Sequence, residues 1–307
     1  MCEAAVEVKN LTKRIGSKTI IKGLDFEIYP GEIFGFLGPN GAGKTTTIRM
    51  MVGLTKITEG DVIIYGKSIK KQFKEAIAQV GAIVENPEMY KFMSGWKNLL
   101  HYARMTPGGV NQDKIEEIVH LTGLENVIHK KVKTYSLGMR QRLGLAQALL
   151  HEPSVLILDE PTNGLDPSGI YEIRSYLRNL AREKGLTIFI SSHLLSEVEI
   201  LCDRVGIIKN GELISVDYIN NFVNAGNETK IKLQLQPIDE ALRVLEQKFN
   251  LSAIVNENNI FVQTNKENVP LIVNALVEHG IDVYNVNIAS ATLEDKFLQM
   301  TGDGTIE

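Results

Sequence analysis

Apolar and polar residues alternate along residues 6–28, with a break at Gly16, Ser17 and Lys18. Alternation with a period of two is typical of strands that bury one face, so this stretch predicts two or three antiparallel strands. Residues 33–37 (IFGFL) are instead almost continuously apolar, as expected of a strand buried on both faces. A parallel sheet is therefore predicted to begin there.

The same patterns recur further along the chain. Buried strands are predicted at 80–84, 155–158 and 187–191, and helices at 45–54, 137–150 and 169–184. Residues 93–122 are helix-rich and are broken at Pro107-Gly108-Gly109, which indicates an inserted helical subdomain. Strands that alternate with helices predict an α/β fold with helices on both faces of a parallel sheet. A hairpin with a type I′ turn is predicted around Asn210-Gly211.

Three parts follow from these patterns. We predict a main domain at 1–220 with its helical subdomain at about 86–150, a linker at 221–229, and a small α+β accessory domain at 230–307. The accessory pattern predicts strands at 231–235, 252–256, 259–264 and 281–288, helices at 238–249 and 267–279, and a short final helix. This order is that of a ferredoxin-like β-α-β-β-α-β unit. The simplest interpretation of this domain is a packing extension; a regulatory site is the alternative, although no motif indicates one.

Composition narrows the possible functions. The chain has 33 basic and 37 acidic residues and a net charge of −4, with no long run of like charge, so we expect no nucleic-acid partner. Its two cysteines, Cys2 and Cys202, are too few for a disulfide framework and favour the cytosol. No apolar run approaches the roughly 18 residues of a membrane-spanning helix. A role at a membrane would therefore require docking onto another protein.

Residues 38–45, GPNGAGKT, match GxxxxGK[ST] between a predicted strand and a predicted helix. The glycines allow backbone N–H groups to surround a phosphate, and the helix N-terminus adds positive potential. Lys44 is placed to reach the β- and γ-phosphates and Thr45 to hold Mg²⁺. The predicted nucleotide-binding residues are Gly38, Pro39, Asn40, Gly41, Ala42, Gly43, Lys44, Thr45 and Thr46. The flanking strand and helix argue against the alternative of a plain glycine turn.

Residues 155–160, VLILDE, form an apolar strand that ends in Asp159 and Glu160. At the carboxyl end of a strand in an α/β sheet, both side chains can address the crevice in which ligands bind. Asp159 is predicted to join the Mg²⁺ shell and Glu160 to polarise the attacking water. Together with the phosphate loop, the pair predicts ATP hydrolysis.

Further motifs resemble those of ABC-type ATPases over about residues 4–220. YSLGMRQR, which begins at Tyr135, resembles the family signature LSGGQ, NGLDP resembles the D-loop, and the histidine after TIFISS resembles the switch histidine. In that family the signature of one subunit closes over the ATP of its partner, so the resemblance implies a head-to-tail dimer. It assigns ATP contacts to Ser136, Gly138, Met139 and Asp166, and catalytic roles to Glu160 and His193. A compatible alternative for Ser136 is that it caps its helix.

Two departures from the family pattern are informative. Ile15 stands where an aromatic residue commonly stacks on adenine, and Glu85 stands where most members have a glutamine. The glutamate, the stretch VENPEMYKFMSGWKNLL and the ending TLEDKFLQMTG resemble the bacitracin-export and lantibiotic-immunity branch. The resemblance implies that Glu85 joins the metal site and passes the nucleotide state to a permease that docks near 86–105. An exposed loop residue is the alternative.

The resemblance implies the ATP-binding subunit of an ABC transporter on the cytoplasmic face of the membrane. With ATP and Mg²⁺ it would drive a separate permease, which would export a peptide antibiotic or a similar amphipathic compound; the dimer partner is a second copy or another ATPase subunit. The alternative is a soluble ABC ATPase acting on nucleic acid or ribosomes. A single phosphate loop and the lack of a heptad run disfavour it. A non-hydrolysing module would require the loss of Glu160 or His193.

Overall fold

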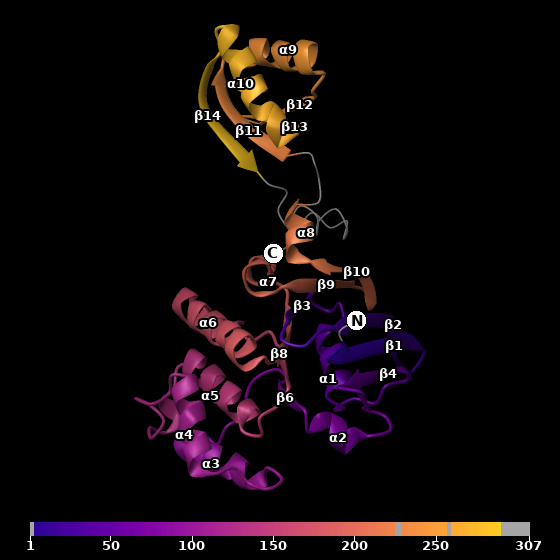
Figure 1. Ribbon diagram of the computed structural model, residues 1–307, viewed down its shortest axis with the longest axis vertical. Coiled ribbons are helices and arrows are strands. Elements are labelled where there is room, and N and C mark those ends of the chain that lie inside the picture. The colour runs from indigo at the N-terminus through magenta and orange to yellow at the C-terminus, as the bar shows by residue number, and fades with distance from the viewer. Residues whose placement is uncertain (1–2, 225–228, 257–258, 290–307) are drawn as a thin grey trace. The chain divides into compact units, whose positions relative to one another are not determined.

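The computed structural model describes residues 3–224, 229–256 and 259–289. The chain divides into two compact units, Met1–Asp217 and Tyr218–Glu307 (Figure 1). The short helix predicted at the C-terminus, and part of the predicted linker at 225–228, lie outside the described residues. The predicted domain boundaries stay predictions.

A six-stranded sheet in the order β10-β9-β3-β8-β7-β6 forms the centre of the first unit. Its strands are β3 (Ile33–Leu37), β6 (Val80–Ile83), β7 (Val155–Asp159), β8 (Thr187–Ser192), β9 (Arg204–Lys209) and β10 (Glu212–Tyr218). The neighbours from β9 to β6 pair in parallel, and β3, β7 and β8 are buried along their whole length. The predicted parallel sheet is confirmed. Asn210 and Gly211 have φ of 51° and 78°, as a type I′ turn requires.

A second, antiparallel sheet has the order β2-β1-β4-β5. It contains β1 (Val6–Ile15), β2 (Lys18–Ile28), β4 (Glu59–Ile64) and β5 (Lys67–Ser68). Phe26 of this sheet stacks on Phe34, Phe36 and Phe189 of the parallel sheet, with ring centroids 5.4–6.2 Å apart. These fully or almost fully buried rings join the two sheets through one apolar core.

Helices complete the first unit. They are α1 (Lys44–Met51), α2 (Phe73–Ile77), α3 (Gly95–Met105), α4 (Gln112–Leu121), η1 (Val132–Thr134), α5 (Leu137–Leu149), α6 (Pro167–Lys184) and α7 (Leu195–Leu201). Figure 1 shows α3, α4 and α5 gathered apart from the antiparallel sheet, as the predicted helical subdomain. The sequence pattern did not predict α2 and α7, which are too short to show a clear helical period.

The second unit is an α+β unit. It contains α8 (Ile219–Asn224), β11 (Thr229–Gln236), α9 (Ile238–Phe249), β12 (Ala253–Asn256), β13 (Asn259–Thr264), η2 (Lys266–Asn268), α10 (Val269–Glu278) and β14 (Asp282–Ala289). Its strands form an antiparallel sheet in the order β12-β13-β11-β14. The two long helices pack on it around an apolar core that includes Leu233, Leu245, Val262 and Leu276. The predicted linker at 221–229 begins within α8, so its first residues are helical.

Candidate nucleotide-binding site

The loop at 38–43 connects the buried strand β3 to α1. Gly41 and Gly43 have φ of 79° and 113°, backbone conformations that residues with a Cβ rarely adopt. A Cβ at Gly38 would lie 2.4 Å from the carbonyl oxygen of Ile208, so this position also requires glycine. Helix α1 begins at Lys44 without a side-chain cap, which leaves the N–H groups of its first turn available to an anion. The loop therefore has the shape and polarity of a phosphate site.

Lys44 brings a buried positive charge into the loop. The residue is 5% exposed, and its Nζ donates to the carbonyl oxygens of Gly38 (2.7 Å) and Pro39 (3.3 Å). The same Nζ lies 3.3 Å from Oε1 of Glu160, at the end of β7. The structure thus brings the predicted phosphate-binding lysine against the predicted water-polarising carboxylate.

Strand β7 ends with the two predicted carboxylates in different environments. Asp159 is buried, and its Oδ1 accepts a hydrogen bond from Ser191 Oγ at 2.6 Å. Glu160 has a φ of 46°, and its N–H donates to the Oγ and the carbonyl oxygen of Ser191. A non-glycine residue in the left-handed region costs about 1–3 kcal/mol and persists where neighbouring contacts impose it, as at active sites. The carboxylate of Glu160 is thereby turned toward Lys44.

His193 lies just after β8 and meets the same carboxylate. Its Nδ1 is 3.1 Å from Oε2 of Glu160, and both side chains are about one quarter exposed. Lys44 therefore contacts one oxygen of Glu160 and His193 the other, and the two residues come from different segments of the chain. When Nδ1 carries the proton and donates, the carboxylate fixes the orientation of the imidazole. Two residues predicted from their motifs and one assigned by resemblance thus form one contiguous cluster.

Three further predicted residues, Ser136, Gly138 and Asp166, line a cavity of about 380 Å³ between the start of α5 and the start of α6. Ser136 caps α5 by accepting from Met139 N (3.2 Å), and Met139 Sδ in turn accepts from Ser136 N (3.3 Å). Asp166 caps α6 by accepting from Gly169 N (3.0 Å). Ser136, Gly138 and Asp166 line this cavity, and none of residues 38–46 is among its described lining. Within one chain, these groups and the phosphate loop form separate sites.

The chain is similar in sequence to known proteins. Residues 21–163 match the family model described as ABC transporter. The chain is 54% identical to the uncharacterized ABC transporter ATP-binding protein YhcH of Bacillus subtilis, over 98% of this chain and 97% of that one. It is 41% identical to the bacitracin transport ATP-binding protein BcrA of Bacillus licheniformis, over 98% of this chain and 98% of that one.

The chain belongs to the ABC transporter ATP-binding proteins. Among solved structures, cbiO1 from Clostridium perfringens, described as part of the ABC transporter complex cbiONQ, has a TM-score of 0.66 and 27% identity. That match covers 80% of this chain and 96% of cbiO1. This protein is therefore an ABC ATPase that binds ATP and hydrolyses it to power transport. Among its described residues, no helix is long and apolar enough to cross a membrane.

In this ABC ATPase, Glu85 lies in a different place from the carboxylate cluster. It follows β6, has a φ of 66°, and forms an ion pair with Arg49 of α1. Its side chain is 60% exposed. The structure therefore sets Glu85 beside the helix that follows the phosphate loop and does not join it to Asp159 or Glu160 by a hydrogen bond. Its predicted role as a metal ligand stays a prediction.

The donor set around the loop fits a magnesium ion that arrives with the nucleotide. Among residues 3–224, 229–256 and 259–289, no group of three or more His, Cys, Asp or Glu is arranged to hold a metal ion. Mg²⁺ is typically held by one or two carboxylates together with substrate phosphates. Asp159, whose Oδ1 bonds Ser191, and the partly buried hydroxyl residue Thr45 supply oxygen donors of this kind.

Sequence reasoning missed Ser191, which binds both Asp159 and the N–H of Glu160. The available signal was the pair of polar residues, Ser191 and Ser192, that ends an otherwise apolar strand next to His193. Thr46, next to Thr45, is partly buried at the start of α1, and Ile15 is 61% exposed at the β1–β2 turn. No described contact assigns either of these two residues a further role.

Proposed function

We propose that this ABC ATPase powers the export of a peptide antibiotic, or a similar amphipathic compound, through a separate membrane permease. The observation that carries the chemistry is the contact of Glu160 with both Lys44 and His193 beside the phosphate loop. The export substrate is supported by the bacitracin transport protein, which is similar along 98% of this chain. The permease places the protein at the cytoplasmic face of the membrane.

In this proposal, Thr45 and Asp159 would hold Mg²⁺ together with the nucleotide, and the ion would supply positive charge beside the phosphates. Glu160 polarises the attacking water, and His193 holds Glu160 and the γ-phosphate in line. Lys44 exchanges its contacts with loop carbonyls for contacts with the β- and γ-phosphates. Phosphoryl transfer depends mainly on positioning and on charge stabilisation, which these groups supply.

The complete site requires two chains in this proposal. Ser136, Gly138 and Asp166 line a cavity whose described lining includes none of residues 38–46 of the same chain, and Met139 is hydrogen-bonded to Ser136. A head-to-tail dimer would place this cavity over the nucleotide of the partner. Ser136 opens α5, so its hydroxyl and the N–H groups of the first turn would then stabilise the γ-phosphate.

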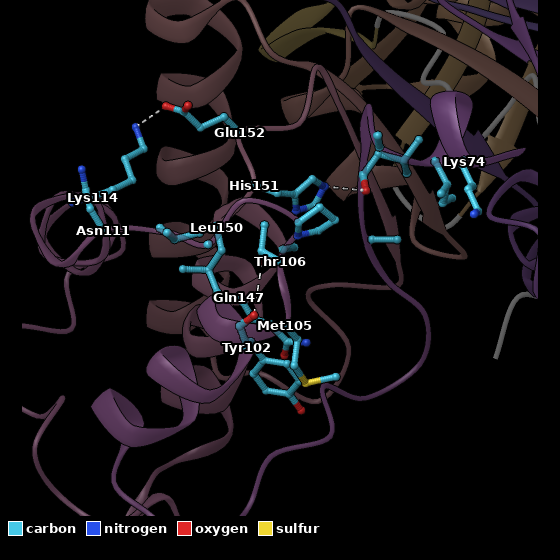
Figure 2. Close-up of a pocket in the computed structure, with 18 residues that line it drawn as sticks. Lys74, Tyr102, Met105, Thr106, Asn111, Lys114, Gln147, Leu150, His151 and Glu152 are labelled. Atoms are coloured by element: carbon cyan, nitrogen blue, oxygen red, sulfur yellow. Dashed lines mark hydrogen bonds and ion pairs between the residues drawn. The ribbon is translucent and has the colours of Figure 1, made fainter. Parts of the chain in front are cut away.

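A larger cavity of about 1000 Å³ offers a docking place for the permease (Figure 2). It lies between α2 and β6 on one side and the ends of α3 and α5 on the other, close to the predicted docking region 86–105. Apolar side chains, including Tyr102 and the 68% exposed Met105, meet charged groups at its rim. Lys114 and Glu152 form an ion pair of 2.6 Å there. A short amphipathic helix of the permease fits such a lining.

Glu85 lies between this docking region and the phosphate site in the sequence. We assign it the role of sensing Mg²⁺ and the γ-phosphate and passing their presence to the permease. Its pairing with Arg49, at the end of the helix that begins with Lys44, supports a link to the phosphate loop. For the second unit, the strand order β12-β13-β11-β14 with two covering helices supports a ferredoxin-like fold.

The test is reconstitution with the membrane protein that co-purifies with this chain. In vesicles that carry the ATPase on their outer face, ATP should drive bacitracin into the lumen, and Glu160→Gln should abolish the uptake. Co-purification with ribosomes or nucleic acid in place of a membrane protein would instead support a soluble ABC ATPase. ATP hydrolysis without uptake of any peptide antibiotic would refute the proposed substrate class.

A further inference from the structure

A buried cluster beyond the end of the large sheet connects two segments of the nucleotide site. Thr162 follows Glu160 by two residues, Ser192 precedes His193, and Glu197 lies in α7. Thr162, Ser192 and Glu197 are 5%, 3% and 6% exposed. The hydroxyl of Thr162 donates to Oε2 of Glu197, and Ser192 Oγ donates to the same oxygen over 3.2 Å. One carboxylate oxygen therefore holds the two segments together.

This contact lies where the main-chain pairing of β7 and β8 ends. The two strands pair in parallel up to Asp159 and Ser191, and Glu160 N donates to Ser191 O at 3.2 Å just beyond. Glu160 and His193 each lie within two residues of a hydroxyl that donates to the Glu197 carboxylate. Nδ1 of His193 lies 3.1 Å from Oε2 of Glu160.

The stability of the fold does not explain why the buried residue Glu197 is a glutamate. Its Oε1 is buried and has no hydrogen-bond partner among the described residues. Burying a charge with an unsatisfied oxygen costs free energy, and replacing incompletely paired buried charges is often neutral or stabilising. An unsatisfied buried polar atom in a native structure calls for a specific explanation, and functional sites are where sequences depart from the most stable choice.

We propose that Glu197 is a positioning residue for ATP hydrolysis, which clamps the segments that carry Glu160 and His193. The inference rests on the roles proposed above for those two residues. Glu197 acts on them through Thr162 and Ser192, to which its hydrogen bonds go. A carboxylate suits this task because two hydroxyl groups converge on one oxygen, and an anionic acceptor forms stronger hydrogen bonds than a neutral one.

The test uses the full-length protein and separates kcat from nucleotide affinity. Glu197→Ala should lower kcat by about 10- to 100-fold, because displacements near 1 Å at reacting groups have effects of this order. The Kd for Mg·ATP should stay within about twofold, because the phosphate loop is not touched. Glu197→Gln should lose less, because its amide oxygen can accept from the same hydroxyls. Thr162→Val and Ser192→Ala each remove one hydroxyl donor to Glu197. If Glu197→Ala fails to fold, these two variants test the clamp in its place.

A double-variant cycle distinguishes positioning from a structural role. The double variant His193→Ala/Glu197→Ala should have a kcat less than about threefold below that of His193→Ala alone. The pair that Glu197 aligns is already lost in His193→Ala. Thr122→Val is the matched control, since this buried threonine donates to Ile118 O (2.8 Å) in the helical subdomain, away from the site. It should lower Tm and leave kcat unchanged.

Three results would overturn the clamp: an unchanged kcat in Glu197→Ala, effects that multiply in the double variant, or an equal loss of kcat in Thr122→Val. Should His193→Ala itself leave kcat unchanged, the role proposed for His193 fails, and the clamp fails with it. A lower kcat in His193→Ala, together with an unchanged kcat in the Glu197 variants, would refute the clamp and leave the role proposed for His193 intact.

Discussion

At the scale of single residues, the nucleotide site depends on contacts that hold one carboxylate in a fixed direction. Glu160 has an unfavourable backbone conformation that its hydrogen bonds to Ser191 maintain. Its two oxygens contact Lys44 and His193. Since each contact comes from a different chain segment, the position of this carboxylate depends on the packing of both segments.

Glu160→Gln should preserve this arrangement and remove the base. The amide has the same shape, so ATP binding should persist while kcat falls by about 10²–10⁴-fold, the usual contribution of general-base catalysis. Phosphate release and size-exclusion chromatography with ATP measure the loss and the expected accumulation of a dimer. Glu212→Gln, which alters an exposed carboxylate paired with Lys22, is the control. Normal turnover by Glu160→Gln would assign the base to another residue.

Glu85 is predicted to couple hydrolysis to the permease more than to support hydrolysis itself. Its exposed side chain pairs with Arg49 and is not joined to the catalytic carboxylates. Glu85→Ala should therefore reduce permease-stimulated hydrolysis and transport more than basal hydrolysis. Glu85→Gln should keep much of the basal hydrolysis, the stimulated hydrolysis and the transport, because its amide oxygen can still face the ion. Reconstituted vesicles provide all three measurements, and full stimulation of Glu85→Ala would identify this residue as ordinary surface.

At the scale of elements, the N-termini of three helices in the first unit differ in how they are capped. Helix α1 begins without a side-chain cap, whereas Ser136 and Asp166 cap α5 and α6. The free first turn of α1 suits a phosphate held within one chain. The start of α5 faces a separate cavity, so the ATP contact proposed for it would be made to the nucleotide of a second chain.

This division predicts that two inactive variants complement each other. Ser136→Arg should abolish hydrolysis and leave ATP binding by the monomer nearly intact, because the phosphate loop is untouched. Lys44→Ala should weaken binding itself, because it removes the buried cation beside the loop. A mixture of the two should regain part of the activity, since a mixed dimer has one intact site. Equal loss of monomer binding in both variants would contradict an arrangement in trans.

At the scale of the whole molecule, the first unit separates ATP chemistry from the proposed permease contact. The phosphate loop and carboxylates lie at the carboxyl ends of the parallel strands. The larger cavity lies between the sheet and the helical subdomain (Figure 2). In the proposed function, a movement of the helical subdomain on ATP binding would change the shape of that cavity and so carry the effect of the chemistry to the permease.

A charge at the rim of this cavity should uncouple transport. Met105 is 68% exposed, so Met105→Asp should leave the fold and basal hydrolysis intact. Binding of the permease should weaken, because an apolar contact is replaced by a desolvated charge. Co-purification and permease-stimulated hydrolysis are the measurements. Leu271→Asp, at a 58% exposed residue of α10 in the other unit, is the control. Equal losses in the two variants would argue against docking at this cavity.

Much of the fold could be predicted because its signals are local. Continuous apolar runs identified β3, β7 and β8, and the turn Asn210-Gly211 identified the hairpin of β9 and β10. Short helices such as α2 and α7 were missed because one or two turns give too few positions to show a period. The strand order of the large sheet comes from pairing between distant segments, which alternation alone does not encode.

The sequence by itself determined the phosphate loop, the acidic pair Asp159-Glu160 and the α/β class. Each depends on residue types at fixed short spacing next to a strand or a helix. Only the tertiary structure decided the further contacts: Ser191 with Asp159 and Glu160, Arg49 with Glu85, and Glu197 with Thr162 and Ser192. Most of these partners lie more than 30 residues apart in the sequence. Ser192 is close to Glu197 in the sequence, but the same carboxylate oxygen also binds the distant Thr162. Their contacts arise from the packing of the sheet and its helices, which no local pattern records.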